Sequence, residues 1–231
     1  MFFLSYLASL YSPCVLAKVI EVPIACLVPT CITDKYFLKR MSSGGGFCVY
    51  ADISLALKIL FGMRLIEKAM IIDLDAHQGN GHERDFGNDE RVFILDVYNP
   101  RIYPRDHQAE RGISRSVHVG SMTSDAEYLR SLLILPSWLN AIFLRHYHSL
   151  NVIWWCIMRE QIALTMIHLV VFLSVKRFCI IRRDELVFDL CRQNETPIAM
   201  LTSGGYLMES ADVIASSIRN LHEKQLIQLK T

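Results

Sequence analysis

Residues 69–83 read AMIIDLDAHQGNGHE, an apolar run that passes directly into acidic, histidine and glycine residues. A short apolar run such as 69–74 is typical of a strand buried on both faces of a parallel sheet. Residues two apart at the end of a strand point the same way, so Asp75 and His77 can face one side together. Ligands of open parallel sheets bind at the carboxyl ends of the strands, and we therefore expect a functional site here.

The residue types of this stretch are suited to a metal ion. Carboxylate oxygens and imidazole nitrogens are ligands of Zn²⁺, and Asp75 and His77 offer one of each. Asp73 lies on the same side and can bind a second cation or orient a histidine. Gly79 and Gly81 allow the backbone to approach a ligand closely. The spacing leaves two interpretations open, a metal site that needs a third ligand and a solvated loop after a strand.

Outside this stretch, strands alternate with helices, which predicts an α/β fold with a parallel sheet covered on both faces. The expected strands are 91–97 and 198–202, and the expected helices are 47–63, 184–192 and 211–223. The 231 residues suffice for one domain with a core, and a formal charge of +1 gives no electrostatic indication of nucleic-acid binding. Seven scattered cysteines without a CxxC pair indicate a reducing compartment.

Two apolar segments allow other interpretations. Residues 1–11, MFFLSYLASLY, resemble the apolar core of a signal peptide, but no basic residue precedes them, which favours the truncated start of a domain. Residues 129–181 contain all three tryptophans and no glycine. Charges at Arg145, Arg159 and Glu160 cut this segment into uncharged runs shorter than the roughly 18–20 residues of a membrane span, so we expect no membrane partner.

Residues 71–86, IIDLDAHQGNGHERDF, closely resemble the metal-binding segment of the zinc-dependent histone deacetylases. The sequence AHQGNGHE at 76–83 is similar to the corresponding segment of their class IV branch, the histone deacetylase 11-like proteins. Further segments resemble the family in the same order: 19–29, 42–61, 91–106, 182–188 and 202–206. The resemblance implies a single domain over 1–231 with a three-layer α/β fold and a parallel sheet, incomplete and truncated at its N-terminus.

The resemblance also implies a site, residue by residue. Asp75 and His77 correspond to zinc ligands, and Asp73 and Asp96 correspond to ligands of a structural potassium ion. Asn80 corresponds to the partner of one catalytic histidine, and Tyr206 to the tyrosine that donates to the developing oxyanion. The implied reaction is hydrolysis of acyl-lysine amides by zinc-activated water, on proteins such as histones. The implied setting is chromatin regulation in the nucleus, and also the cytoplasm.

The sequence departs from the family pattern in two places. The family's histidine pair belongs to a segment that is absent between Met41 and Ser42, and no other histidine here sits in a comparable motif. The last zinc ligand belongs to an NAGTD-like segment, which is missing from the aberrant residues 130–180. Read one base out of frame, codons for 154–175 can encode VVYNAGTDCIDNDPLGGLSIS, with the aspartate codon across Gln161 and Ile162. We therefore expect a deacetylase-like hydrolase with impaired activity, or alternatively an inactive product that acts at most as a binding protein.

Overall fold

The computed structural model describes residues 26–29, 51–120, 122–130, 152–158, 177–194, 196–203 and 208–228. Several sequence features lie outside these residues. They are Tyr206, the glycine loop at 42–46, the junction of Met41 with Ser42, and the out-of-frame position at Gln161 and Ile162. The statements below concern the described part of the chain.

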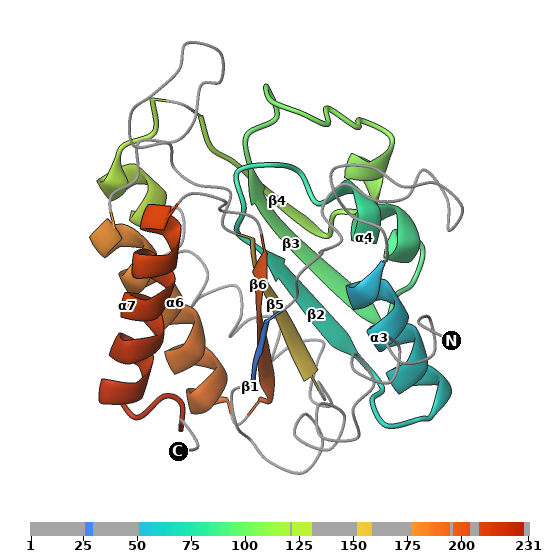
Figure 1. Ribbon diagram of the computed structural model, residues 1–231. Coiled ribbons are helices and arrows are strands. Elements are labelled where there is room, and N and C mark those ends of the chain that lie inside the picture. The colour runs from blue at the N-terminus through green and yellow to red at the C-terminus, as the bar shows by residue number, and fades with distance from the viewer. Residues whose placement is uncertain are drawn as a thin grey trace.

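The core of the molecule is a six-stranded sheet in which every pairing is parallel (Figure 1). Its strand order is β1-β6-β5-β2-β3-β4. The strands are β1 (Cys26–Pro29), β2 (Ala69–Asp73), β3 (Val92–Tyr98), β4 (Arg115–His118), β5 (Val152–Met158) and β6 (Ile198–Ser203). Residues 69–73 thus form an inner strand, β2, which pairs with β3 on one side and with β5 on the other.

Helices cover both faces of the sheet (Figure 1). One face carries α6 (Arg177–Gln193) and α7 (Met208–Glu223), and the other carries α3 (Asp52–Gly62) and α4 (Asn80–Phe86). A short 3-10 helix, η2 (Ala109–Gly112), follows β3, and residues 125–130 form a further helical segment. The three layers confirm the predicted α/β fold. No helix in the described ranges is long and apolar enough to span a membrane.

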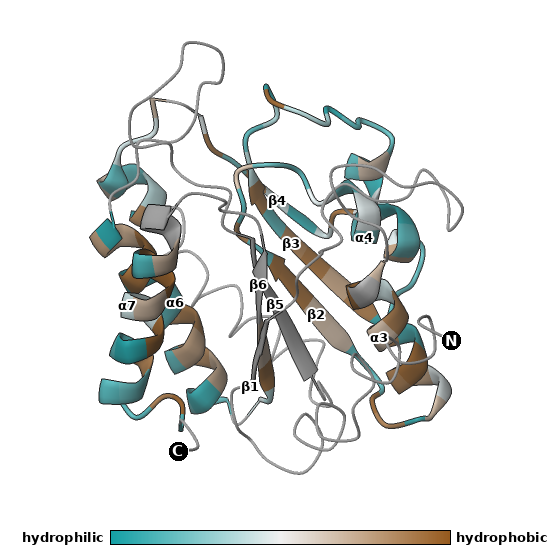
Figure 2. Cartoon of the chain, viewed as in Figure 1, coloured by the Kyte–Doolittle hydropathy of each residue, from teal (hydrophilic) through white to brown (hydrophobic). Residues whose placement is uncertain are grey.

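Side chains of β2 alternate between two separate hydrophobic cores. Met70 and Ile72 of β2 face the core beneath α6 and α7, whereas Ala69 and Ile71 face the core beneath α3. The same alternation holds in β3 and at the start of β6. All five residues of β2 are buried because both of its faces are covered. Figure 2 shows that β2 and β3 are largely apolar.

An ion pair in α6 ties the helical layer to the end of β2. Arg183 and Asp184 are both buried, and Arg183 Nε donates to Asp184 Oδ1 at 2.9 Å. Arg183 Nη1 also donates to the carbonyl of Leu74 at 3.3 Å and to the Tyr128 hydroxyl at 3.4 Å. Ser217 of α7 donates its hydroxyl to Asp184. The network joins four parts of the chain within a few ångströms of the residues that follow β2.

Three of the elements that the sequence did not predict are β4, α4 and β5. The edge strand β4 is mostly exposed, so it carries no apolar pattern that would signal a strand. Residues 80–86 form the short helix α4, whereas the sequence pattern predicted no helix there and allowed a solvated loop. The third element, β5, falls within the aberrant segment 130–180, and it lies in the middle of the sheet between β2 and β6. The described sheet is therefore continuous across this segment.

Candidate metal and acid–base site

The backbone after β2 is held by its own aspartates. The Asp75 N–H donates to Asp73 Oδ1 at 3.1 Å, and the His77 N–H donates to Asp75 Oδ1 at 2.6 Å. Aspartate side chains commonly accept from the backbone two residues on, which explains why the alternating acids form a tight turn here. All three side chains are buried, so the interpretation as a solvated loop is wrong.

Asp75 and His77 converge on one point. His77 Nδ1 lies 3.2 Å from Asp75 Oδ1. Two ligand atoms of a tetrahedral zinc ion, with bonds of about 2.0–2.2 Å, lie roughly 3.3 Å apart. The pair therefore fits two corners of a zinc site, one with a carboxylate oxygen and one with an imidazole nitrogen. Among the described residues, no cluster of three metal-binding side chains completes such a site.

Asp73 and Asp96 lie behind this pair, toward the face of the sheet that carries α4. They are register partners at the carboxyl ends of β2 and β3, and both are fully buried. Asp96 Oδ2 accepts from the Gly79 N–H at 2.8 Å, and Asp73 Oδ2 lies 3.7 Å from His82 Nε2. Adjacent carboxylates are hard oxygen donors, a chemistry that suits a cation.

Gly79 is required at the start of α4 by this packing. A Cβ built on Gly79 would overlap the His82 ring and the Asp73 carboxylate. The backbone of residue 79 can donate to Asp96 only because nothing extends from its Cα into that space. Gly79 thus lies close to a side-chain cluster, and its approach to a ligand stays a prediction.

Glu83 is a further acid in the same cluster. Burial is the largest cause that raises its pKa to about 7, and nearby Asp73 and Asp106 raise it too, while hydrogen bonds with Asp96 and Gln78 oppose the rise. Gln78 Nε2 donates to Glu83 Oε2 at 2.7 Å. A carboxyl group with this pKa can exchange a proton near neutral pH. The site thus combines a candidate metal pair with a group able to take part in acid–base chemistry.

Asn80 occupies the first turn of α4 beside the loop that follows β3. Its Nδ2 donates to Asp106 Oδ2 at 3.0 Å. Its Oδ1 is buried and has no hydrogen-bond partner among the residues that the structure describes. An acceptor in this state is compatible with the role that the family resemblance implies, which is to receive a hydrogen bond from an imidazole N–H.

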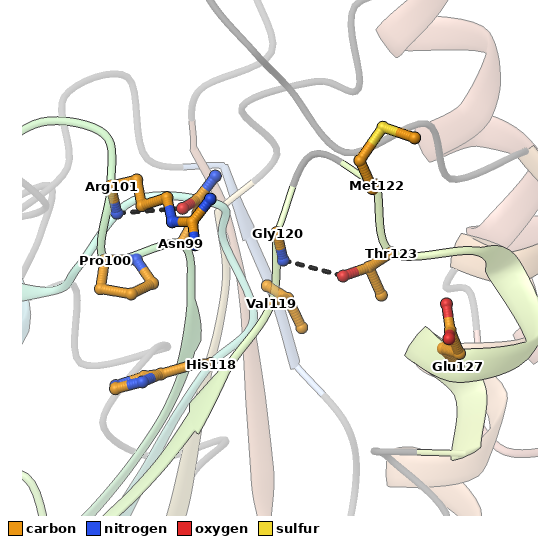
Figure 3. A pocket seen from close by; sticks show the side chains of 9 residues that line it. All are labelled: Asn99, Pro100, Arg101, His118, Val119, Gly120, Met122, Thr123 and Glu127. Carbon is orange, nitrogen blue, oxygen red and sulfur yellow. Dashed lines mark hydrogen bonds between the residues drawn. The ribbon is translucent and has the colours of Figure 1, made fainter.

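A cavity of about 620 Å³ opens beyond the carboxyl ends of β3 and β4 (Figure 3). Arg101 and His118 lie along one part of its wall, and Met122 and Glu127 lie across from them. The cavity adjoins the candidate metal loop, since the Asn99 N–H donates to the carbonyl of Ala76 at 2.8 Å. Met122 is almost wholly exposed, so this cavity is open to solvent.

The structure brings together five of the six residues singled out from the sequence: Asp73, Asp75, His77, Asn80 and Asp96. Tyr206 lies outside the described residues, and its position stays a prediction. Sequence reasoning did not assign roles to His82, Glu83 or Asp106. His82 and Glu83 lie about one helical turn after Gly79. A helix predicted at 80–86 would have placed both side chains on its buried face. Asp106 carried no local signal.

Solved structures with the same arrangement are deacetylases and related amide hydrolases. The chain is similar to the HD domain of HDA15, with a TM-score of 0.63 and 17% identity over 87% of this chain and 56% of that one. It is also similar to acetylpolyamine aminohydrolase from Burkholderia pseudomallei, with a TM-score of 0.65 and 15% identity over 88% and 57% of the two chains. At these identities the likeness shows the fold, which is the three-layer parallel-sheet deacetylase fold.

Sequence comparisons give a more specific likeness than the fold does. Residues 40–142 match the histone deacetylase domain. The chain is 45% identical over 187 residues to histone deacetylase 2 of Arabidopsis thaliana, which covers 81% of this chain and 46% of that protein. Over 70 residues it is 34% identical to the chloroplastic histone deacetylase 10 of Oryza sativa subsp. japonica. The chain is therefore similar to histone deacetylases over these residues, and it spans about half the length of the first of these relatives.

Proposed function

We propose that this chain is a lysine deacylase domain of the class IV branch, built to use zinc and to act on acyl-lysine side chains of proteins such as histones. The observation that carries the proposal is the convergence of Asp75 and His77 at the carboxyl end of β2, within a deacetylase fold. The wording AHQGNGHE at 76–83 supports the assignment to class IV. By the same resemblance we place the protein in the nucleus, where it would act on chromatin, and also in the cytoplasm.

The proposed chemistry assigns a task to each described residue. Asp75 and His77 would hold the zinc ion, which when bound polarises the acyl carbonyl and activates a water molecule. Asp73 and Asp96 would hold a potassium ion behind the site and fix the turn that carries both ligands. Asn80 Oδ1 would accept a hydrogen bond from a catalytic imidazole, and Tyr206 would donate to the oxyanion, as the family resemblance implies.

We further propose that the chain as it stands has little hydrolytic activity. The sequence lacks the family's histidine pair between Met41 and Ser42, and it lacks the NAGTD-like segment that carries the third zinc ligand. Loss of a general acid or base alone lowers the rate by about 10²–10⁴-fold. A second candidate function follows from the same features, namely a catalytically inactive product that binds metal weakly or binds partners.

Purified chain, incubated with acetyl-lysine and longer acyl-lysine peptides with and without a chelator, tests these proposals. Little or no deacylation is expected, together with zinc binding below one ion per chain. The Asp75→Ala variant should lose the bound zinc, whereas Asp89→Ala, at an exposed ion pair with Arg91, should retain it. Chelator-sensitive deacylation at a rate typical of enzymes would refute the proposed impairment. Zinc binding that survives Asp75→Ala would refute the assigned metal pair.

The origin of segment 130–180 has a separate test. We propose that this part of the single domain is the family's sequence in a shifted frame. The nucleotide sequence of the transcript decides this directly. A frame shifted by one base should read NAGTD across codons 157–162, and any other reading there rules the explanation out.

A further inference from the structure

Asp106 is the centre of a hydrogen-bond network around Asn80. Arg84 donates to both carboxylate oxygens of Asp106, with its Nε 2.7 Å from Oδ2. The Ala109 N–H donates to Oδ1 at 3.2 Å. The backbone of Asp106 is held as well, because its N–H donates to Gln78 Oε1 at 2.9 Å and its carbonyl accepts from Gln78 Nε2 at 3.0 Å. The carboxylate is therefore fixed in position relative to α4.

An ionised carboxylate can only accept hydrogen bonds, and this decides how the Asn80 amide is oriented. Burial opposes ionisation of Asp106, but the hydrogen bonds from Arg84 and Asn80 outweigh it and lower the pKa of this group. The amide nitrogen of Asn80 must therefore face Asp106, as the 3.0 Å contact shows. The Oδ1 atom then points the other way, where it is buried and finds no hydrogen-bond partner in the described part of the chain.

We propose that the Arg84–Asp106 ion pair is a positioning pair for Asn80, which locks the side-chain amide so that Oδ1 presents a buried acceptor to a hydrogen-bond donor in the site. The part that names the donor rests on the proposed function, in which it is an imidazole N–H. The pair also accounts for an amide at position 80. An aspartate there would set a second carboxylate about 3 Å from Asp106, where two negative charges repel.

Hydrogen exchange of the Asn80 side-chain NH₂ group, followed by NMR on the full chain, tests the lock. In Asp106→Ala the exchange should become about tenfold faster or more, because the protecting acceptor is gone. The matched control is Asp89→Ala, which also removes an arginine-bonded aspartate but lies away from Asn80. Exchange in this control should stay as in the unmodified chain. Unchanged Asn80 exchange in Asp106→Ala would overturn the proposal.

A pair of variants at position 80 keeps the test decisive if Asp106→Ala does not fold. Asn80→Asp should lower the unfolding midpoint, because two carboxylates then meet. Asn80→Ala removes the same amide without adding a charge, so it should lower the midpoint less. A loss in Asn80→Asp no larger than in Asn80→Ala would overturn the proposal. Neither measurement uses hydrolysis or zinc binding, so zinc binding that survives Asp75→Ala would refute the proposed metal pair while leaving this inference to its own result.

Discussion

Two buried charged regions flank the turn after β2, and they are composed differently. The α6 ion pair, Arg183 with Asp184, matches one cation to one anion and fixes the Leu74 carbonyl. On the other side of the turn lies an acidic cluster of four carboxyl groups with two buried histidines. Its carboxyl groups are Asp73, Asp75, Glu83 and Asp96, and its histidines are His77 and His82.

The difference indicates that the first region stabilises the fold, and it supports the proposal that the second binds a cation. A matched buried pair gains nothing from binding a further ion, whereas a surplus of carboxyl groups is stabilised by a bound cation or by a proton. Burial is the main cause of the raised pKa of Glu83, and the charges of Asp73 and Asp106 raise it further. The convergence of Asp75 and His77 offers two ligand atoms to a cation. We therefore expect the two regions to respond in opposite ways to substitution, pH and metal.

The largest effect should come from breaking the α6 ion pair. Arg183→Met leaves the buried Asp184 without its cation, and the unfolding free energy should fall by about 3–5 kcal/mol. Denaturant unfolding measures this. Arg182→Met is the matched control, because Arg182 is exposed and pairs with Glu185 on the surface. That control should change stability by about 0–1 kcal/mol. Equal losses in the two variants would contradict a structural role for Arg183.

The acidic cluster should make stability depend on pH in chelator-treated protein. The pKa of Glu83 is raised to about 7 in the fold from 4.5, so the folded chain keeps a proton that the unfolded chain releases. Unfolding free energy should therefore decrease as pH rises from about 4.5 to 7, by up to about 3 kcal/mol. Glu83→Gln should flatten this decrease in a series of unfolding curves. A slope that survives the substitution would show that another group causes it.

A smaller effect should follow from filling the space beside the acidic cluster. Gly79→Ala places a methyl group against His82 and Asp73, and overpacking of this kind costs about 1–3 kcal/mol. Gly62→Ala is the matched control, because a Cβ there meets nothing within 4 Å at the end of α3. Its stability should be unchanged or higher by up to about 1 kcal/mol, since alanine favours a helix. Thermal unfolding of both variants separates the two outcomes.

The sequence predicted those elements whose pattern is local. The apolar run at 69–74 matched β2, the run at 91–97 matched β3, and the run at 198–202 matched β6, each within a residue or so. The helix expected at 184–192 begins seven residues earlier, at Arg177. Arg183 and Asp184 are charged but buried, so they interrupt the alternation of apolar and polar residues that would indicate a helix. A hydrophobic pattern alone therefore does not reveal this part of α6.

Strand geometry alone predicted that Asp75 and His77 face one side, but it left a metal site and a solvated loop both open. The resemblance to the histone deacetylases supplied the expected roles of Asn80, Asp96 and Tyr206. The contact of Asn80 with Asp106 spans 26 residues and depends on how the loop after β3 folds back. Likewise, the pairing of Asp73 with Asp96 depends on the register of two strands. Long-range contacts of this kind come from packing, which the residue pattern does not encode locally.

The pairing of β1 with β6 sets the order in which the chain can finish folding on the ribosome. Cys26 is in register with Ala199, about 170 residues later. At a synthesis rate of roughly 5–20 residues per second, β1 waits on the order of ten seconds or more for its neighbour to emerge. During that time its backbone groups lack the strand that satisfies them in the finished sheet, and pairing with another nascent chain competes. Chaperone demand during synthesis should therefore be greatest before β6 appears.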